Sequence, residues 1–298
     1  MTLRLLVLGT AAGGGLPQWN CGCPNCDAAR DGTIPAASQS SVAVTANGED
    51  WAILNASPDI RTQLATAPPL HPTGPRASPI RSVLVTNGDI DHVAGLLTLR
   101  EKQAFGLFAT AAIHEVLAAN PIFAALDPAH VARETVALDA PFRLVEGVTA
   151  ELFAVPGKVP LYMEGGEVDT QLMGEQTVGV RLEAGGEEAF YLPGCAAMPD
   201  DLKARLDGAA LVLFDGTVWE NEEMIRMGVG AKTGARMGHM AISGEHGSMA
   251  AFQGLEVGRK VFVHLNNTNP VLDPRSDERA AVEAAGWQVA HDGMELSA

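Results

Sequence analysis

The sequence has few basic side chains and no long apolar run. Of its 298 residues, 20 are Lys or Arg and 36 are Asp or Glu, so the formal net charge is −16. A surface of this sign repels nucleic-acid phosphates and anionic lipids, so neither is an expected partner. Apolar runs such as 210–214 have the length of a strand, far short of the roughly 20 residues that cross a bilayer. Because residues 1–9 read directly as a strand, without a charged leader or a cleavage site, we expect a cytoplasmic protein.

Cysteine is also scarce, with four in the chain, but three of them stand within six residues. Cys21, Cys23 and Cys26 are spaced so that one tetrahedral ion can bind all three as thiolates, which predicts a structural zinc site. A disulfide scaffold is not expected in a cytoplasmic protein, and a redox Cys-x-x-Cys pair would leave Cys21 unexplained. The alternative is three free thiols. The residues next to the cluster in the sequence do not provide a fourth ligand. This ligand is either Cys195 or a His, Asn or Asp from a distant loop.

Short apolar runs precede segments of helical periodicity in both halves of the chain, which predicts a layered α/β fold in one compact domain, residues 1–298. The expected strands cover residues 3–9, 41–46, 51–55, 82–86, 149–155, 178–183, 189–193, 210–215, 260–265 and 287–291. The expected helices cover residues 92–104, 111–119, 199–206, 248–257 and 276–285.

Three further segments read as irregular. The Pro-rich stretch 67–79 and the stretch 156–177, rich in Gly and acidic residues, are expected to be surface loops. The segment 216–247 contains four Met and several Gly and is too irregular for a core element. It is either a lid or wall of a pocket, or a disordered excursion.

The loop from Thr86 to His92 follows an expected strand and is similar to half of a known metal-binding motif. In the metallo-β-lactamase fold, a His-x-His-x-Asp-His loop holds two metals, and here its four positions read Asn87, Asp89, Asp91 and His92. The two histidines of the first metal site are absent, whereas the Asp-His pair of the second is present. Lys158 stands where a third motif has His, and Gly194 stands where a fourth has a bridging Asp.

A fifth motif of that fold, a late strand ending in His, is matched by Lys260 to His264. The remaining ligand set is therefore Asp91, His92 and His264. Two imidazoles and one carboxylate with open positions are typical of non-haem Fe(II) oxygenases, so we predict one active-site metal, iron. The alternative is that Asp91 only caps the following helix. Asp89 is either a fourth ligand or an acceptor that orients a histidine.

Several segments in chain order resemble the pyrroloquinoline quinone (PQQ) biosynthesis protein B family. They are residues 11–21, 55–61, 86–92, 213–217, 237–239 and 263–270, including Gln-Trp-Asn-Cys before the cysteine cluster and Asn-Asn-Thr-Asn-Pro after His264. The resemblance implies a metallo-β-lactamase-like αββα sandwich, in which two mixed β-sheets are flanked by helices. It also implies that the cysteine cluster is similar to the zinc site of a related phosphodiesterase. A His completes that site, and its position here is Asn267, a weaker ligand through its carbonyl oxygen.

The function that the resemblance implies is oxidation during assembly of PQQ from a Glu and a Tyr of a short peptide. The substrate would be the small, crosslinked Glu-Tyr precursor, and the reaction would be hydroxylation of its tyrosine ring with Fe(II) and O₂. The alternatives are a non-catalytic carrier or transport factor for PQQ or its precursor, and a residual zinc hydrolase. A homodimer, and contacts with other proteins of the PQQ pathway, are among the partners to be tested.

A substrate with several carboxylates and an amine requires cationic and polar anchors. We take Lys158, Arg61, Arg236 and Asn87 as candidates, although each charged one could equally be a surface charge or part of a salt bridge. His239, in Met-Gly-His, is the candidate acid or base, because related hydrolases place one in this region. Two sites are rejected as nucleotide loops: residues 9–15, which lead into the cysteines and form a tight loop at the pocket floor, and residues 230–233. Asp215 is either catalytic or, more commonly for such a turn, a hydrogen-bond acceptor.

Overall fold

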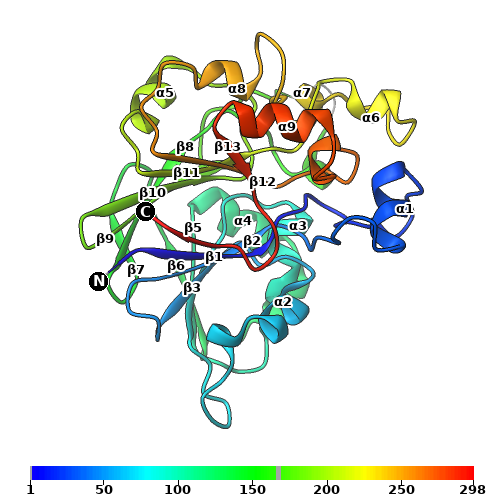
Figure 1. Ribbon diagram of the computed structural model, residues 1–298. Helices are drawn as coiled ribbons and strands as arrows, with labels where there is room; N and C mark the ends of the chain where they lie inside the picture. The colour runs from blue at the N-terminus through cyan, green and yellow to red at the C-terminus, as the bar shows by residue number, and fades with distance from the viewer. Residues whose placement is uncertain (1, 166–168) are drawn as a thin grey trace.

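Two seven-stranded sheets stack face to face between two layers of helices (Figure 1). The computed structural model describes residues 2–165 and 169–298. This is the αββα sandwich of two mixed sheets that the sequence predicts. Among the described residues, no helix is long and apolar enough to cross a membrane.

The first sheet has the strand order β14-β1-β2-β3-β4-β5-β6. Its strands pair in antiparallel fashion from β14 to β3 and in parallel from β3 to β6. The strands span Arg4–Gly9 (β1), Ser41–Thr45 (β2), Trp51–Leu54 (β3), Ile80–Leu84 (β4), Phe105–Ala109 (β5), Val131–Thr135 (β6) and Glu295–Ser297 (β14).

The second sheet has the order β13-β12-β11-β10-β9-β8-β7 and repeats this arrangement. Strands β10 to β13 are parallel, and β7 to β10 are antiparallel. The strands span Phe142–Val145 (β7), Val148–Ala154 (β8), Val178–Ala184 (β9), Glu187–Leu192 (β10), Leu211–Asp215 (β11), Arg259–Val263 (β12) and Trp287–Val289 (β13).

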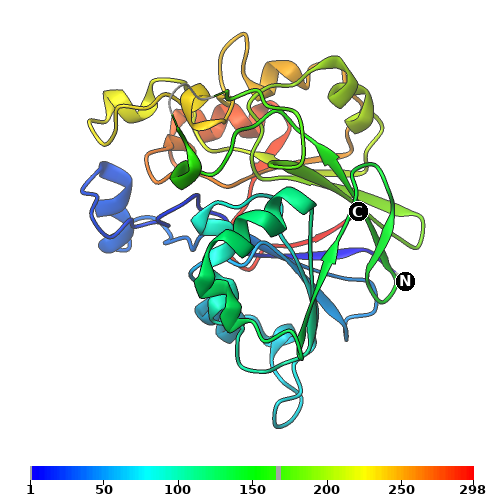
Figure 2. The same cartoon turned by 180° about the vertical axis from the view of Figure 1, so that it is seen from behind.

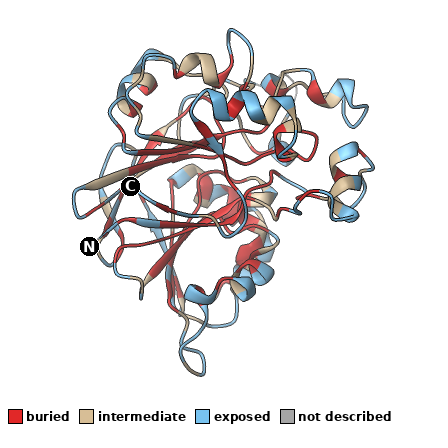
Figure 3. Cartoon of the chain, in the orientation of Figure 1, coloured by how far each residue is buried: buried red, intermediate tan, exposed pale blue. Residues whose placement is uncertain are grey.

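Successive side chains along each strand point to opposite faces of the sheet. One apolar cluster therefore lies between the two sheets, and one lies on the outer face of each sheet. In β1, Leu5 and Val7 point between the sheets, where they meet residues such as Leu182 of β9, whereas Leu6 and Leu8 point outward. Both faces of each sheet are therefore buried, one by the other sheet and one by helices. Figure 3 shows buried residues concentrated along the strands of both sheets.

Helices cover the two outer faces. The helices span Pro24–Arg30 (α1), Ile60–Thr66 (α2), Ile90–Val93 (α3), Ala111–Ala119 (α4), Asp200–Leu206 (α5), Glu223–Arg226 (α6), Gly234–Met237 (α7), Ser248–Ala251 (α8) and Asp277–Ala284 (α9). Helices α2 to α4 lie against the first sheet and α5, α8 and α9 against the second, as the front and back views agree (Figures 1 and 2). Helix α1 lies to one side of both layers in these views, and its Cys26 packs into the apolar cluster on the outer face of the second sheet.

The structure corrects several predicted elements. The helix expected at 92–104 is replaced by α3 and a 3₁₀ turn at Ala94–Leu97, and the helix expected at 248–257 ends at Ala251. Strands β5, β6, β7 and β14 and helices α1, α2, α6 and α7 were not predicted; the last two lie in the segment 216–247. The expected loop 67–79 contains only a short 3₁₀ turn, Pro68–Leu70. The expected loop 156–177 contains one at Leu161–Met163, and its residues 166–168 lie outside the described chain.

Several loops leave the carboxyl ends of strands at one end of the sandwich. They follow β1, β4, β8, β10, β11 and β12, and residues from the loops after five of these strands line one cavity. In α/β folds, the carboxyl ends of parallel strands are where ligands bind, because many chain turns converge there.

Candidate metal centre

The loop after β4 is held by the loop after β3. Asn55, with a left-handed φ of 61°, accepts a hydrogen bond from the Thr86 N–H through Oδ1 at 2.9 Å. Asp89 is the N-cap of α3 and makes no side-chain capping bond. Asp91 lies in the first turn, and its carboxylate points to His264 instead of capping the helix. Asp91 is therefore an acidic residue of the first turn of α3 and not its N-cap, which is Asp89.

Asp91, His92 and His264 offer ligand atoms that lie within 4.8 Å of one another. His264 Nε2 is 3.1 Å from Asp91 Oδ2, and His92 Nε2 is 3.9 Å from the same oxygen. His264 follows β12 and has a left-handed φ of 58°, a strained conformation for a non-glycine residue that is typical of functional sites. The structure thus brings together the three residues predicted to hold the active-site metal.

His92 has unsatisfied hydrogen-bonding capacity that a metal would use. Its side chain is 1% exposed, and neither ring nitrogen has a partner among the described residues. Burial lowers the pKa of His92 to about 4, so the ring is neutral at pH 7 and carries a free lone pair. A buried polar group without a partner lowers the stability of the folded protein by about 1–3 kcal/mol. An ion bound to His92 would remove this destabilisation.

Asp215 and Thr217 orient the neighbouring histidines. His239 Nδ1 donates to Asp215 Oδ2 at 2.7 Å, and the Thr217 hydroxyl donates to Asp215 Oδ1 at 2.6 Å. The same hydroxyl can then accept from His264 Nδ1, which is 2.8 Å away. Since the network assigns a proton to each Nδ1, each histidine in its neutral form presents a bare Nε2.

His264 Nε2 lies 3.1 Å from Asp91 Oδ2, so this contact holds either a proton on Nε2 or a cation shared by the two atoms. Burial alone would oppose ionisation of Asp91, but the adjacent His92 and the contact with His264 hold the pKa of its carboxyl well below its usual range. The pKa of His264 is raised, although burial opposes its charging, because Asp91 is in hydrogen-bonding contact. The protonated His264 pairs with Asp91 when no metal is bound, and a divalent metal fits the same donor set of two imidazoles and one carboxylate.

A second group of potential ligands was missed from the sequence. Asp215, His239 and His264 also lie within 4.8 Å of one another. From its sequence context Asp215 was either catalytic or, more commonly, an acceptor in a turn, and its carboxylate does accept from the N–H of Thr217 at 3.0 Å and of Cys195 at 2.9 Å. It could not be linked to the site, because its histidine partners are 24 and 49 residues further along the chain.

A cavity of about 300 Å³ adjoins this centre. It is lined by residues that include the predicted Asn87, Asp89, Asp91, Lys158, His239 and His264, together with Ala12, Gly13, Gln18, Thr217, Met224, Lys232 and Met237. The segment 216–247 is thus a wall of the cavity, and the loop after β1 forms part of its floor. A larger hollow of about 460 Å³ beside β1 and α2 has no His or Cys in its lining.

The predicted substrate anchors differ in where they lie relative to the cavity. Lys158 lines the cavity, and Arg236 approaches it through an ion pair with Glu164 at 2.9 Å. Arg61 is exposed on α2 and is not among the residues that line the cavity, so the structure does not bring it together with the other candidate anchors. Gly194 leaves space beside His239, because a Cβ there would lie 3.5 Å from His239 Cε1.

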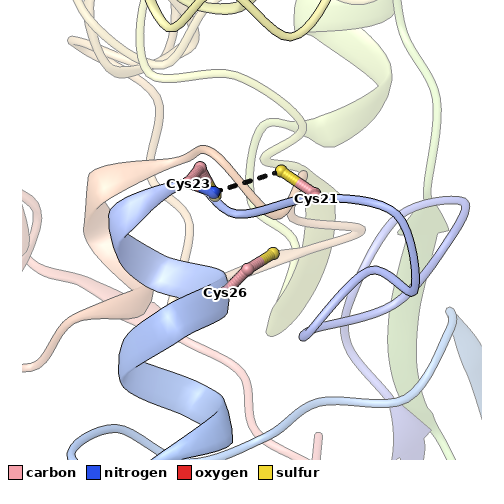
Figure 4. Close-up of side chains that lie close together, drawn as sticks. All are labelled: Cys21, Cys23 and Cys26. Atoms are coloured by element: carbon pink, nitrogen blue, oxygen red, sulfur yellow. Dashed lines mark hydrogen bonds between the residues drawn. The ribbon is translucent and has the colours of Figure 1, made fainter.

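The three clustered cysteines converge at the start of α1 (Figure 4). The N–H of Cys23 donates to Cys21 Sγ at 3.4 Å, and the N–H of Gln18 donates to Cys26 Sγ at 3.3 Å. Burial raises the pKa of Cys23 to about 11, so a thiolate there requires a compensating cation. Cys195 is elsewhere, buried against Ala197, and is not the fourth ligand.

Asn267 caps the three sulfurs. Its side-chain amide nitrogen is 3.2, 3.4 and 3.3 Å from Sγ of Cys21, Cys23 and Cys26. A half-turn of the carboxamide would place the oxygen in the same position, and only the oxygen can bind a metal. The geometry therefore suits a tetrahedral zinc with Asn267 Oδ1 as fourth ligand. The loop after β12 carries both this residue and His264.

Comparison with known proteins identifies the family. A family model described as a beta-lactamase superfamily domain matches residues 50–265. The chain is 60% identical over 294 residues to coenzyme PQQ synthesis protein B of Ruegeria pomeroyi, with 99% of each chain covered. It is 56% identical to the protein of the same name from Rhizobium meliloti, covering 99% of this chain and 97% of the relative. The chain belongs to the coenzyme PQQ synthesis protein B family.

Solved structures agree with membership of the PQQ synthesis protein B family. A crystal structure described as Zn(2+)-bound PqqB from Methylobacterium extorquens has a TM-score of 0.97 and 53% identity, covering 98% of this chain and 99% of that chain. A diphosphatase from the PhnP family has a TM-score of 0.72 at 20% identity, covering 100% and 98%, which shows a common fold alone. The family resemblance and fold class expected from the sequence are confirmed, and a family member is known with bound zinc.

Proposed function

We propose that this protein acts in PQQ biosynthesis as a mononuclear Fe(II)- and O₂-dependent hydroxylase of the tyrosine ring in a crosslinked Glu-Tyr precursor. The family supports the pathway, because relatives of 60% and 56% identity are named coenzyme PQQ synthesis protein B. The observation that carries the reaction type is the convergence of Asp91, His92 and His264 with two unpartnered nitrogens on His92.

Asp91, His92 and His264 would hold one ion at the edge of the cavity. Asp91 and His264 line the cavity, whereas His92 lies behind them and is 1% exposed. Bound Fe(II) would supply the activation of O₂ that hydroxylation of a phenol ring requires. Gly194, where related hydrolases have a bridging carboxylate, removes a ligand for a second ion and opens space beside His239.

The remaining cavity residues would bind and orient the substrate. Lys158 supplies a positive charge, and Asn87 a polar side chain whose Oδ1 already accepts from the Asp89 N–H at 2.9 Å. His239 is held by Asp215 through Nδ1, so its Nε2 is free to accept or return a proton of the substrate ring. Burial and the neighbouring Asp91 raise the pKa of Asp89, whereas the charge of Lys158 opposes this shift, so we infer that Asp89 would help to hold Lys158 in the cavity.

Replacing Asp215 by asparagine tests the orienting role. Asp215→Asn presents an amide to His239 Nδ1, so we expect turnover to fall about 10- to 100-fold while the metal content is unchanged. Both are measured by a turnover assay and elemental analysis of the same sample. Asp200→Asn is the matched control, because the Asp200 side chain is fully exposed on α5. A loss of bound metal in Asp215→Asn would instead make Asp215 a ligand.

The proposal itself is tested with the wild-type protein, loaded anaerobically with Fe(II) and then given O₂ and the crosslinked Glu-Tyr precursor. We expect oxygen uptake matched by a gain of one oxygen atom in the product, seen by mass spectrometry, and none after loading with Zn(II). An absence of uptake with the Fe(II)-loaded protein would contradict the proposal.

A second candidate function is zinc-dependent hydrolysis. It is favoured by the second potential ligand group, Asp215, His239 and His264, and by the zinc in a relative of 53% identity. Turnover of bis(4-nitrophenyl) phosphate by the Zn(II)-loaded protein, abolished by Asp215→Asn, would support this function over hydroxylation.

A further inference from the structure

The segment after β8 passes over the metal cavity and is fastened to the loop after β4. Leu161 lines the cavity, and its N–H donates to Asp89 Oδ1 at 3.2 Å. The hydroxyl of Tyr162 donates to the carbonyl oxygen of Gly88 at 2.7 Å. These contacts place the next described acidic residue, Glu164, beside the cavity wall formed by 216–247.

Three cationic side chains converge on the Glu164 carboxylate. Lys158 Nζ lies 3.0 Å from Oε1, whereas Arg236 Nη2 and Lys232 Nζ lie 2.9 and 3.5 Å from Oε2. The Glu164 side chain is 10% exposed and that of Lys158 is 9% exposed. Two of the three cations, Lys158 and Lys232, also line the metal cavity.

Hydrogen bonding within this cluster is incomplete. Glu164 Oε1 is buried and has no hydrogen-bond partner among the described residues, although Lys158 Nζ lies 3.0 Å away and donates to the carbonyl oxygen of Val159. Arg236 Nη1 is buried and has no hydrogen-bond partner among the described residues, so a donor of the guanidinium fork is unused. Arg binds a carboxylate best through two parallel N–H donors, and here only Nη2 is engaged. Such a concentration of positive charge stands out on a chain with a net charge of −16.

We propose that Lys158, Lys232 and Arg236 form a carboxylate-binding subsite of the metal cavity, and that Glu164 occupies this subsite until a carboxylate of the substrate displaces it. This inference rests on the proposed function for the location of the substrate, and it adds which group of the substrate is recognised and by what. A substrate carboxylate takes over the ion pairs that Glu164 gives up, so the exchange leaves no cation unpaired.

The displacement explains selectivity for polycarboxylates. A neutral molecule cannot compete with Glu164 for three cations, whereas a di- or tricarboxylate can replace it and still reach the metal with its other end. Because Glu164 occupies the site, the apparent affinity is reduced by the fraction of molecules in which the site is free. Removing the charge of Glu164 should therefore strengthen binding, which is the opposite of the usual effect of deleting a pocket residue.

The test is calorimetric titration of the zinc-containing, full-length protein with benzene-1,3,5-tricarboxylate, and with its uncharged trimethyl ester. We expect Glu164→Gln to bind the tricarboxylate about 10-fold more tightly than the wild type, and the ester no better. Arg236→Gln and Lys232→Met should each weaken binding of the tricarboxylate by about 10-fold. Glu101→Gln, which removes one exposed negative charge outside the cavity lining, is the matched control and should leave the affinity unchanged.

Equal or weaker binding by Glu164→Gln would overturn the proposal, since Glu164 would then be a structural latch or a ligand-binding group itself. If Glu164→Gln does not fold, unchanged affinity in Arg236→Gln and Lys232→Met would overturn it equally. No iron, oxygen or turnover is needed for this measurement. A negative result in the hydroxylase assay therefore does not contradict the proposed carboxylate subsite. A negative result in the titration does not contradict the proposed hydroxylase activity.

Discussion

Alanine in place of His92 is expected to lower Fe(II)-dependent oxygen uptake by more than about 100-fold and to remove the active-site iron, because only Asp91 and His264 would remain as ligands. His92 is suited to this test, since it is 1% exposed and neither of its ring nitrogens has another partner among the described residues. Its substitution therefore removes no hydrogen bond found in the structure.

The measurement combines an oxygen electrode with iron analysis of the same preparation. His92→Gln retains most of the side-chain volume and serves where alanine leaves too large a cavity for folding. His291→Ala is the control, because His291 is exposed and outside the cavity lining. Full oxygen uptake by either His92 variant with its iron retained would exclude the proposed ligand set. A non-catalytic carrier would still support PQQ formation in cells after His92→Ala.

Substitution of Cys23 is expected to have the largest effect on stability. Cys23→Ser should cost the protein one equivalent of zinc and lower the unfolding temperature by at least about 5 °C, because a structural zinc contributes its binding free energy to folding. Cys23 is 5% exposed and is the N-cap of α1, so the effect should be local to α1 and the chain before it.

Limited proteolysis and zinc analysis check this expectation. Cleavage near α1 should become faster in Cys23→Ser, because loss of the zinc would remove one of the contacts that hold this helix, besides the hydrogen bonds of Asn25 and the packing of Cys26. Cys195→Ser is the matched control. It changes a buried cysteine that is outside the cluster, so it should keep the zinc whatever its effect on packing. Unchanged zinc content in Cys23→Ser would rule out the cysteine site.

Sequence reasoning worked where the signal is local. Cys21, Cys23 and Cys26 are close in the chain, so their spacing alone predicts that three sulfurs converge. Asp91 and His92 are adjacent, and His264 ends a strongly apolar strand, so each could be recognised by its strand context. Because the fold aligns strand ends, these residues meet although they are far apart in sequence.

Other features depend on contacts that no local pattern encodes. Strand β6 is an edge strand with a burial pattern of one buried residue followed by four exposed ones, so Val131–Thr135 lacks the alternation of a half-buried strand. Arg61 was chosen for its charge alone, and its direction depends on the rotation of α2. Glu164 could not be recognised from the sequence, because two of its three cationic partners, Lys232 and Arg236, come from the distant segment 216–247.

The loop after β12 contributes to both metal sites within four residues. His264, at its start, belongs to the proposed iron site, and Asn267 belongs to the cysteine site. Asn25 of α1 fastens this loop by donating to the carbonyl oxygens of Asn267 at 3.1 Å and Asn269 at 2.9 Å. Whatever fixes Asn267 also limits the backbone freedom of His264. The two metal sites should therefore be thermodynamically linked, so that zinc at the cysteines raises the affinity for iron by the same factor by which iron raises the affinity for zinc.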